Sequence, residues 1–140
     1  FGSDPPMTLD SRLSRMLHML IHIDLHDGRA TSETIAQMLG TNPVVVRRMM
    51  AGLREQGYVE AVRGPHGGWK LARDLADITV LDVHNALGSP SLFAVGLAVD
   101  HPDCPVERSV NAALGKIFDD AEARVTSRYD KITLADLIPG

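Results

Sequence analysis

The stretch TNPVVVRRMMAGLREQGYVEAVRGPHGGWKLAR, residues 41–73, decides the fold. Asn42 followed by Pro43 predicts a helix start, because asparagine caps a first turn and proline tolerates its first position. The helix is expected to run from Val44 to Gln56 and to stop at Gly57. Residues 58–63 and 69–72 then predict two short strands around the glycine-rich turn 64–68. The stretch is therefore expected to form a helix followed by a β-hairpin.

The residues before this stretch predict two further helices. Apolar side chains recur at helical spacing from Leu9 to Leu25 and stop before Asp27. A short helix capped by Thr31 or Ser32 should follow and end at Gly40. Together with the helix after Asn42 it makes a helix-turn-helix. The order predicts a winged helix-turn-helix, mainly α with a small β-hairpin wing.

The second half predicts two more helices and a loop. Thr79 is expected to cap a helix through Leu87, and the apolar residues 92–99 either line an effector pocket or pack under the next helix. A helix of about 20 residues begins near Val106, and it outruns the small core before it. Its apolar stripe is therefore expected to form a dimer interface, made by Val110, Leu114, Ile117, Ala121 and Val125. Thr133 should cap a last short turn.

These patterns divide the chain into four segments. Residues 1–6 look like a tag remnant, 7–75 form the winged helix-turn-helix DNA-binding domain, 76–104 a connecting helix and loop, and 105–140 the dimerisation helix and C-terminal turn. No run approaches the roughly 20 apolar residues that span a bilayer. We expect a cytoplasmic protein without a membrane partner.

Charge is distributed unevenly along the chain, whose formal net charge is -4. Residues 1–75 carry nine Lys or Arg and eight Asp or Glu, whereas residues 76–140 carry five and ten. Residues 42–73 alone hold six basic and two acidic side chains. A local basic surface on an acidic protein predicts binding to double-stranded DNA. Ordinary solvated charges are the alternative.

Two groups of residues are the candidate DNA contacts. The first turns of a reading helix reach base edges in the major groove, and here they contain Thr41, Asn42, Val44, Arg47 and Arg48. The wing brings backbone amides and basic side chains to the phosphates, and its candidates are Arg63, Gly64, Pro65, His66, Gly67 and Lys70. Trp69 is expected to anchor the wing to the helical core.

The segment LREQGYVEAVRGPHGGWKLAR, residues 53–73, resembles the Rrf2-type bacterial transcription regulators, and the likeness extends from Met7 to a terminal ITLADLI. The resemblance implies a two-fold symmetric homodimer on a pseudo-palindromic operator, and we expect the protein to act as a repressor. It implies that the wing enters the minor groove beside the site read by the helix. By position it places DNA contacts at Asn42, Val44, Arg47, Arg48 and residues 63–67.

Cys104 is the single cysteine of the chain. The resemblance implies three cysteines before the long helix in cluster-binding members, and a histidine where this chain has Glu107. The chain is therefore similar to the cysteine-poor branch, and we expect no iron-sulfur cluster or other cofactor. A helix start stabilises a thiolate, whereas the neighbouring carboxylates oppose it. Redox sensing and apolar packing both remain open for Cys104, and the signal is an unknown small molecule or oxidant.

Two other functions compete with DNA binding. A thiol-dependent enzyme would use Cys104 as nucleophile and needs a positioned base, for which His101 is the nearest in sequence. A winged helix that contacts only proteins would bind DNA weakly. His18, His22 and His26 are spaced for a metal ion, but a solvated or interfacial stripe is the preferred interpretation. We expect a regulator that is not an enzyme and has no metal site.

Overall fold

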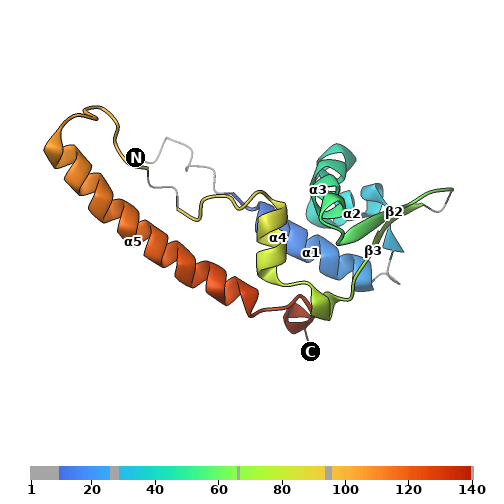
Figure 1. Ribbon diagram of the computed structural model, residues 1–140. Coiled ribbons are helices and arrows are strands. Elements are labelled where there is room, and N and C mark those ends of the chain that lie inside the picture. The colour runs from blue at the N-terminus through green and yellow to red at the C-terminus, as the bar shows by residue number, and fades with distance from the viewer. Residues whose placement is uncertain (1–9, 26–28, 66, 94–95, 140) are drawn as a thin grey trace, which may run out of the picture.

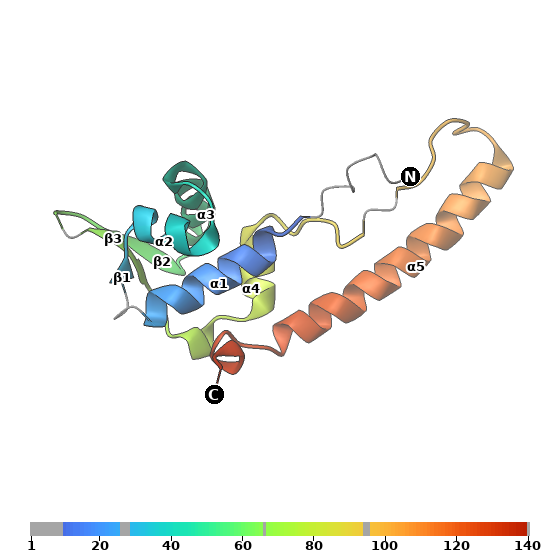
Figure 2. The same ribbon diagram turned by 180° about the vertical axis from the view of Figure 1, so that it is seen from behind.

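The computed structural model describes residues 10–25, 29–65, 67–93 and 96–139. Its elements are α1 (Arg12–Leu25), β1 (Arg29–Ala30), α2 (Ser32–Leu39), α3 (Pro43–Glu55), β2 (Val59–Val62), β3 (Gly68–Leu71), η1 (Leu75–Asp77), α4 (Val80–Ala86), α5 (Pro105–Asp130) and η2 (Ala135–Leu137). Figures 1 and 2 show a small α/β body from which α5 stands away. The predicted fold class, mainly α with a hairpin wing and a long C-terminal helix, is confirmed. The expected tag remnant 1–6, Leu9, His26, Asp27 and His66 lie outside the described residues.

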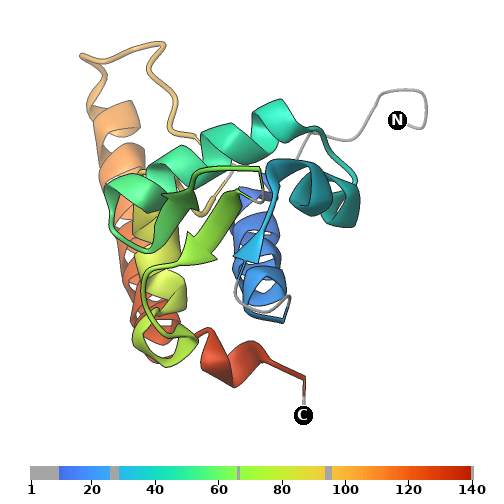
Figure 3. The same cartoon turned by 90° about the vertical axis from the view of Figure 1, so that its right-hand side faces the viewer.

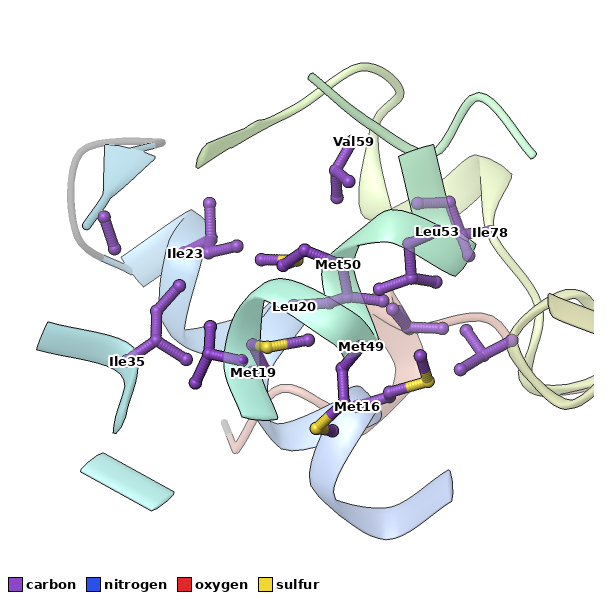
Figure 4. Close-up of a cluster of buried hydrophobic side chains, with 14 of the residues drawn as sticks. Met16, Met19, Leu20, Ile23, Ile35, Met49, Met50, Leu53, Val59 and Ile78 are labelled. Atoms are coloured by element: carbon purple, nitrogen blue, oxygen red, sulfur yellow. The ribbon is translucent and has the colours of Figure 1, made fainter. Parts of the chain in front are cut away.

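One apolar core joins the helices of the body to the sheet. From α1 it takes Met16, Met19, Leu20 and Ile23, and from α3 it takes Val46, Met49, Met50 and Leu53. Both sets repeat at three- and four-residue spacing, so each helix turns one face inward. Figure 4 shows the α1 and α3 side chains meeting in the middle of the cluster. The core therefore fixes the depth and rotation of α3.

The turn between α2 and α3 follows the predicted signals. Gly40 has a φ of 67°, a left-handed conformation that glycine adopts without strain. The Asn42 side-chain oxygen accepts a hydrogen bond from the Val45 amide at 3.1 Å, and Pro43 is the first helical residue. At the start of α2, the Thr31 hydroxyl accepts from the Thr34 amide at 3.0 Å, so Thr31 is the cap.

The sheet has three antiparallel strands in the order β1-β3-β2. β2 and β3 are the predicted hairpin, whereas the two-residue strand β1 has no sequence signal of its own. It pairs Arg29 with Lys70 and Ala30 with Trp69. Gly68 permits this pairing, because a Cβ there would lie 2.4 Å from the Ala30 carbonyl oxygen. The wing is thus tied to the chain segment that leads into α2.

Trp69 anchors the hairpin to the helices, as predicted. Its ring packs against the core, and its indole N–H donates a hydrogen bond to the Ser32 hydroxyl at 3.0 Å. Ser32 is the first residue of α2 and is buried. The contact joins β3 to the helix-turn-helix, so the base of the wing and the helix-turn-helix are held together.

α5 is longer than predicted and is fixed to the body at its C-terminal end. It has 26 residues, none of them buried. The chain then returns to the core, where Leu134 is fully buried and its N–H donates to the Ile78 carbonyl at 2.9 Å. The Val80 N–H donates to the Ile132 carbonyl at 2.9 Å. The expected last turn after Thr133 is the short helix η2.

The apolar stretch 92–99 runs beside α5 where the structure describes it. The Phe93 and Phe118 rings lie 5.7 Å apart, and the Asn111 side-chain amide donates to the Ala98 carbonyl at 2.8 Å. These contacts favour packing along the helix over an effector pocket. No helix among the described residues is both long and apolar enough to cross a membrane.

A double-mutant cycle tests the anchor of the wing. Ser32→Ala and Trp69→Phe should each lower the free energy of unfolding by about 1 kcal/mol, because each removes one partner of a partly buried hydrogen bond. The double mutant should lose less than the two single losses combined, by roughly 1 kcal/mol. Urea unfolding measures all three, with the exposed Ser109→Ala as control. Strictly additive losses would contradict the coupling between Ser32 and Trp69.

Candidate nucleic-acid interface

α3 presents its N-terminal turn and one side to solvent. Val44 is 50% exposed and Arg47 is exposed, whereas Val46 and Met50 on the opposite side are fully buried. Thr41 and Asn42 lie at the N-terminal end of this helix, where free backbone amides and the helix dipole favour anions. The Asn42 oxygen is engaged in the cap, which leaves its side-chain NH2 group to donate. The exposed turn therefore offers hydrogen-bond donors, a guanidinium and an apolar side chain.

Arg47 and Arg48 have different surroundings. Arg48 is also exposed, but it lines a cavity between α1 and α3 together with Arg15 and Val45. Arg47 does not line that cavity. Neighbours on a helix are about 100° apart, and Val44 lies between the two arginines, three residues before Arg47 and four before Arg48. Of the predicted helix contacts, Val44, Arg47 and Arg48 therefore share one exposed face, and Arg48 lies at the edge of that face that borders α1.

The wing is a hairpin whose tip is exposed. α3 lies along the hairpin, as Figure 3 shows. Arg63, Gly64 and Pro65 are all exposed, and the Gly67 N–H donates to the Gly64 carbonyl at 2.9 Å, which closes the turn. A Cβ at Gly67 would lie 2.4 Å from the Val62 carbonyl oxygen, so only glycine permits this tight turn. Arg63 therefore lies at the base of an exposed tip in which Gly64 and Gly67 carry no side chain to cover the backbone.

Ion pairing distinguishes the basic residues of this surface. Lys70 lies opposite Glu60 across β3 and β2, with 3.4 Å between the Lys70 Nζ and a Glu60 carboxylate oxygen. Neither Arg47 nor Arg63 has a carboxylate partner within 4 Å in the part of the chain that the structure describes. Arg47 and Arg63 are therefore available to phosphates, whereas Lys70 is partly neutralised.

Arg29 is a basic residue that the sequence patterns miss. β1 places it on the edge of the sheet, opposite Lys70, and it is exposed. It extends the basic surface from the wing toward the start of α2. The pairing joins residues about 40 positions apart in the chain, and a strand of two residues has no periodicity to detect.

Cys104 caps the start of α5, where the sequence places it. It is partly buried, and its N–H donates to the His101 carbonyl at 2.9 Å. Glu107 accepts a hydrogen bond from the His101 backbone N–H at 2.8 Å, so its carboxylate is directed to this loop. Among the described residues no side-chain base is hydrogen-bonded to the thiol. The arrangement gives no support to an activated nucleophile.

The histidines of α1 contact one another on an exposed side of the helix. The Nε2 atoms of His18 and His22 are 2.7 Å apart, and the ring centroids are separated by 4.4 Å. His26, the third residue of the predicted stripe, is outside the described part of the chain. Within that part, no group of three or more His, Cys, Asp or Glu side chains is arranged to hold a metal ion.

The predicted dimer residues form a stripe along α5. Val110, Leu114 and Ile117 are 49%, 36% and 59% exposed. Ala121 and Val125 are half-buried, nearer the end that returns to the body. The exposed apolar side chains therefore concentrate on the part of α5 that stands away from the core (Figure 1).

Comparison with known proteins gives a consistent assignment. A family model named Rrf2 and described as an iron-dependent transcriptional regulator matches residues 9–140. YwnA of Bacillus subtilis, named as an HTH-type transcriptional regulator, is 34% identical over 131 residues, which cover 93% of this chain and 96% of YwnA. The HTH-type transcriptional regulator IscR of Photorhabdus laumondii is 27% identical over 141 residues, 94% of this chain and 79% of IscR.

Solved structures resemble the chain over most of its length. The crystal structure of a protein described as DNA-binding superposes with a TM-score of 0.74 at 31% identity, covering 92% of this chain and all of that one. T. potens IscR superposes with a TM-score of 0.61 at 25% identity, covering 94% of this chain and 86% of its own. The fold of the body and the long helix is therefore shared with transcription regulators.

The iron in the family description does not fit the donor atoms of this chain. An iron–sulfur cluster is held by several cysteine thiolates, and Cys104 is the single cysteine here. Glu107 occupies the position after Cys104 where IscR-like members are expected to carry a histidine, and its carboxylate is bonded to backbone. One chain thus lacks the ligand set for a cluster of the usual kind.

The family model spans nearly the whole described chain, and the match to YwnA is 34% identical over more than nine-tenths of both proteins. The relatives described above are named as transcriptional regulators. The chain belongs to the Rrf2 family of transcriptional regulators.

Proposed function

We propose that the protein is a DNA-binding transcription regulator that binds operator DNA as a homodimer and represses transcription in the cytoplasm. The observation that carries the proposal is the position of Arg47 and Arg63. Both are exposed and lack a carboxylate partner among the described residues, and they lie on α3 and on the hairpin packed beside it.

The two arginines suit different parts of a DNA duplex. An α-helix fits the major groove, where a guanidinium pairs with guanine through two hydrogen bonds and an apolar side chain contacts the thymine methyl group. Arg47 and Val44 supply these two chemistries from one face of α3. Arg63 on the wing suits a phosphate or the narrow minor groove. We therefore assign base recognition to α3 and the orientation of the protein on the duplex to the wing.

The apolar stripe of α5 supports a homodimer. Val106 is 70% exposed and Ile117 is 59% exposed, although each is a large apolar side chain in a regular helix. Contiguous apolar exposure of this kind is typical of an interaction surface. A second copy of the same helix would cover it and would give the two-fold symmetry that most soluble oligomers have. Two α3 helices would then read half-sites about one DNA turn apart, roughly 34 Å.

Cys104 is the proposed site of a redox signal. Peroxide oxidises a thiolate to a sulfenic acid, with reduction of the peroxide to water or hydroxide. Cys104 lies at the start of the proposed dimerisation helix, where a change in size and polarity would be transmitted to the interface. An unidentified small molecule is the alternative signal.

Substitution of the two arginines tests DNA recognition. Arg47→Ala should weaken binding to an operator duplex about tenfold and relax base preference at one position, because a bidentate base contact contributes roughly 1–3 kcal/mol. Arg63→Ala should weaken binding to all duplexes and reduce the salt slope by about one. The duplex is first selected from a random-sequence library with purified protein, and affinities are measured by fluorescence anisotropy.

Arg108→Ala is the matched control for these variants, since it removes the same charge from an exposed position on α5. It should leave the affinity unchanged. If the native protein binds DNA only weakly and without salt dependence, the chain is a winged helix that contacts proteins instead. Unchanged affinity in Arg63→Ala would remove the wing from the interface.

Ile117→Glu tests the dimer. A carboxylate in the middle of the apolar stripe should convert dimers to monomers, because burying it unpaired is unfavourable. Ile117 is 59% exposed in the single chain, so the monomer should retain its helical circular dichroism. Sedimentation velocity measures the change, with the exposed Ala112→Glu on the opposite side of α5 as control. A fully dimeric Ile117→Glu protein would exclude this stripe as the interface.

Mild peroxide tests the role of Cys104. It should change the affinity of the native protein for the selected operator by several-fold, reversibly with a thiol reductant, and leave Cys104→Ser unaffected. Anisotropy measures the affinity, and mass spectrometry measures oxidation at Cys104. Equal responses of the two proteins would eliminate the redox role.

A further inference from the structure

A cavity of about 420 Å³ lies between the start of α1, the middle of α3 and the end of α4. We call it the α1–α3 cavity. Its floor is apolar, formed by Met16, Val45, Met49 and Leu87. Its rim carries three arginines, Arg12, Arg15 and Arg48. The site therefore combines an apolar floor with a basic mouth, and through Arg48 it borders the exposed face of α3 that carries Arg47.

The described residues that line the cavity include three arginines and no Asp or Glu, and Asp10 pairs with one of these arginines. Arg12 is held by Asp10 through two hydrogen bonds, of 2.8 and 3.0 Å, and these bonds lower the pKa of Asp10 to about 2. Asp10 therefore stays ionised and keeps Arg12 paired. Arg15 and Arg48 have no carboxylate within 4 Å in the described chain, so two guanidinium groups at the mouth are free for an anion.

The floor is suited to a flexible or planar apolar group. Met16 and Met49 are 2% and 8% exposed, and Figure 4 shows their side chains together at one edge of the core cluster. Methionine adapts to irregular shapes because its side chain is unbranched and polarisable. Gly52 lets α3 approach α4, since a Cβ there would lie 3.2 Å from the Ala86 carbonyl oxygen. The walls thus come from three elements that the core already holds in place.

We propose that the α1–α3 cavity binds an organic anion with an apolar body, whose carboxylate pairs with Arg15 and Arg48 while its hydrocarbon lies on the methionine floor. Arginine pairs with carboxylates in bidentate geometry, which gives direction as well as affinity. Binding pockets of this size are mostly apolar, with a few polar groups that fix the orientation of the ligand.

The position of Arg48 links this cavity to the reading helix. Arg48 follows Arg47 on α3, so a bound anion places negative charge beside the face proposed to meet DNA. Phosphates then lose part of the attraction that α3 offers them. This regulatory consequence rests on the proposed DNA-binding function, whereas the binding of the anion does not.

Calorimetric titration of the full chain with octanoate tests the site. Octanoate should bind saturably with one site per chain. Octan-1-ol, which has the same hydrocarbon without the charge, and propionate, which has the charge without the long hydrocarbon, should each bind at least about tenfold more weakly. Arg48→Gln and Arg15→Gln should each raise the octanoate dissociation constant about tenfold, the effect expected for one charge-assisted hydrogen bond.

Arg54→Gln is the matched control, because it removes an exposed arginine from the same helix away from the cavity. It should leave the octanoate affinity within about twofold of the native value. The proposal is overturned if octanoate does not bind, as when a second copy of the chain covers the cavity. It is also overturned if octan-1-ol binds as tightly as octanoate. The same holds if Arg48→Gln, like the control Arg54→Gln, binds octanoate with the native affinity.

A second measurement separates the cavity from DNA binding. Saturating octanoate should lower the affinity of the native protein for the selected operator several-fold, at constant ionic strength, and should have a much smaller effect on Arg48→Gln. If no operator is found, the proposed DNA-binding function fails while the calorimetry still decides the cavity. If octanoate binds and the operator affinity does not change, the coupling to α3 is overturned.

Discussion

α3 must bury one face in the core while its remaining surface carries both the proposed DNA contacts and part of the α1–α3 cavity. The rest of the structure depends on this constraint. Val46, Met50 and Leu53 are fully buried against α1 and the sheet, and this packing fixes the rotation of the helix about its axis. Once the rotation of α3 is fixed, the direction in which each of its other residues faces is fixed as well. Val44 and Arg47 turn outward, and Arg48, at the edge of the same exposed face, lines the cavity beside α1 together with Val45. A change in the core that rotated α3 would move both surfaces together.

Local signals in the sequence predict the order of the elements. The cap at Asn42, the left-handed Gly40 and the glycine-rich turn of the wing each act within a few residues, and each is where the sequence places it. The predicted anchoring role of Trp69 is confirmed by its packing against the core and its hydrogen bond to Ser32. The Rrf2 resemblance rests on these same residues.

The features that the sequence does not reveal are contacts between distant segments. β1 exists because Gly68 permits the Ala30 backbone to approach, and nothing around Ala30 predicts it. The burial of Leu134 beneath Ile78 depends on the chain returning after a 26-residue helix. Arg47 and Arg48 look equivalent in the sequence, and only the packing of α3 on α1 separates them. Residue contacts with DNA and the assignment of Val110, Leu114, Ile117, Ala121 and Val125 to a dimer remain predictions.

α5 is attached to the body at its C-terminal end, so a small rotation at the attachment moves the far end of the helix by several ångströms. Its 26 residues span about 39 Å, and the backbone hydrogen bonds that follow it hold one end, at Leu134 and Ile132. A tilt of about 5° at this joint would displace the far end by about 3 Å over that length. In a dimer held along α5, the same tilt would move each DNA-binding body relative to the other. The operator spacing that such a dimer accepts would then be set at a buried joint remote from the DNA, where small changes in packing have their largest effect.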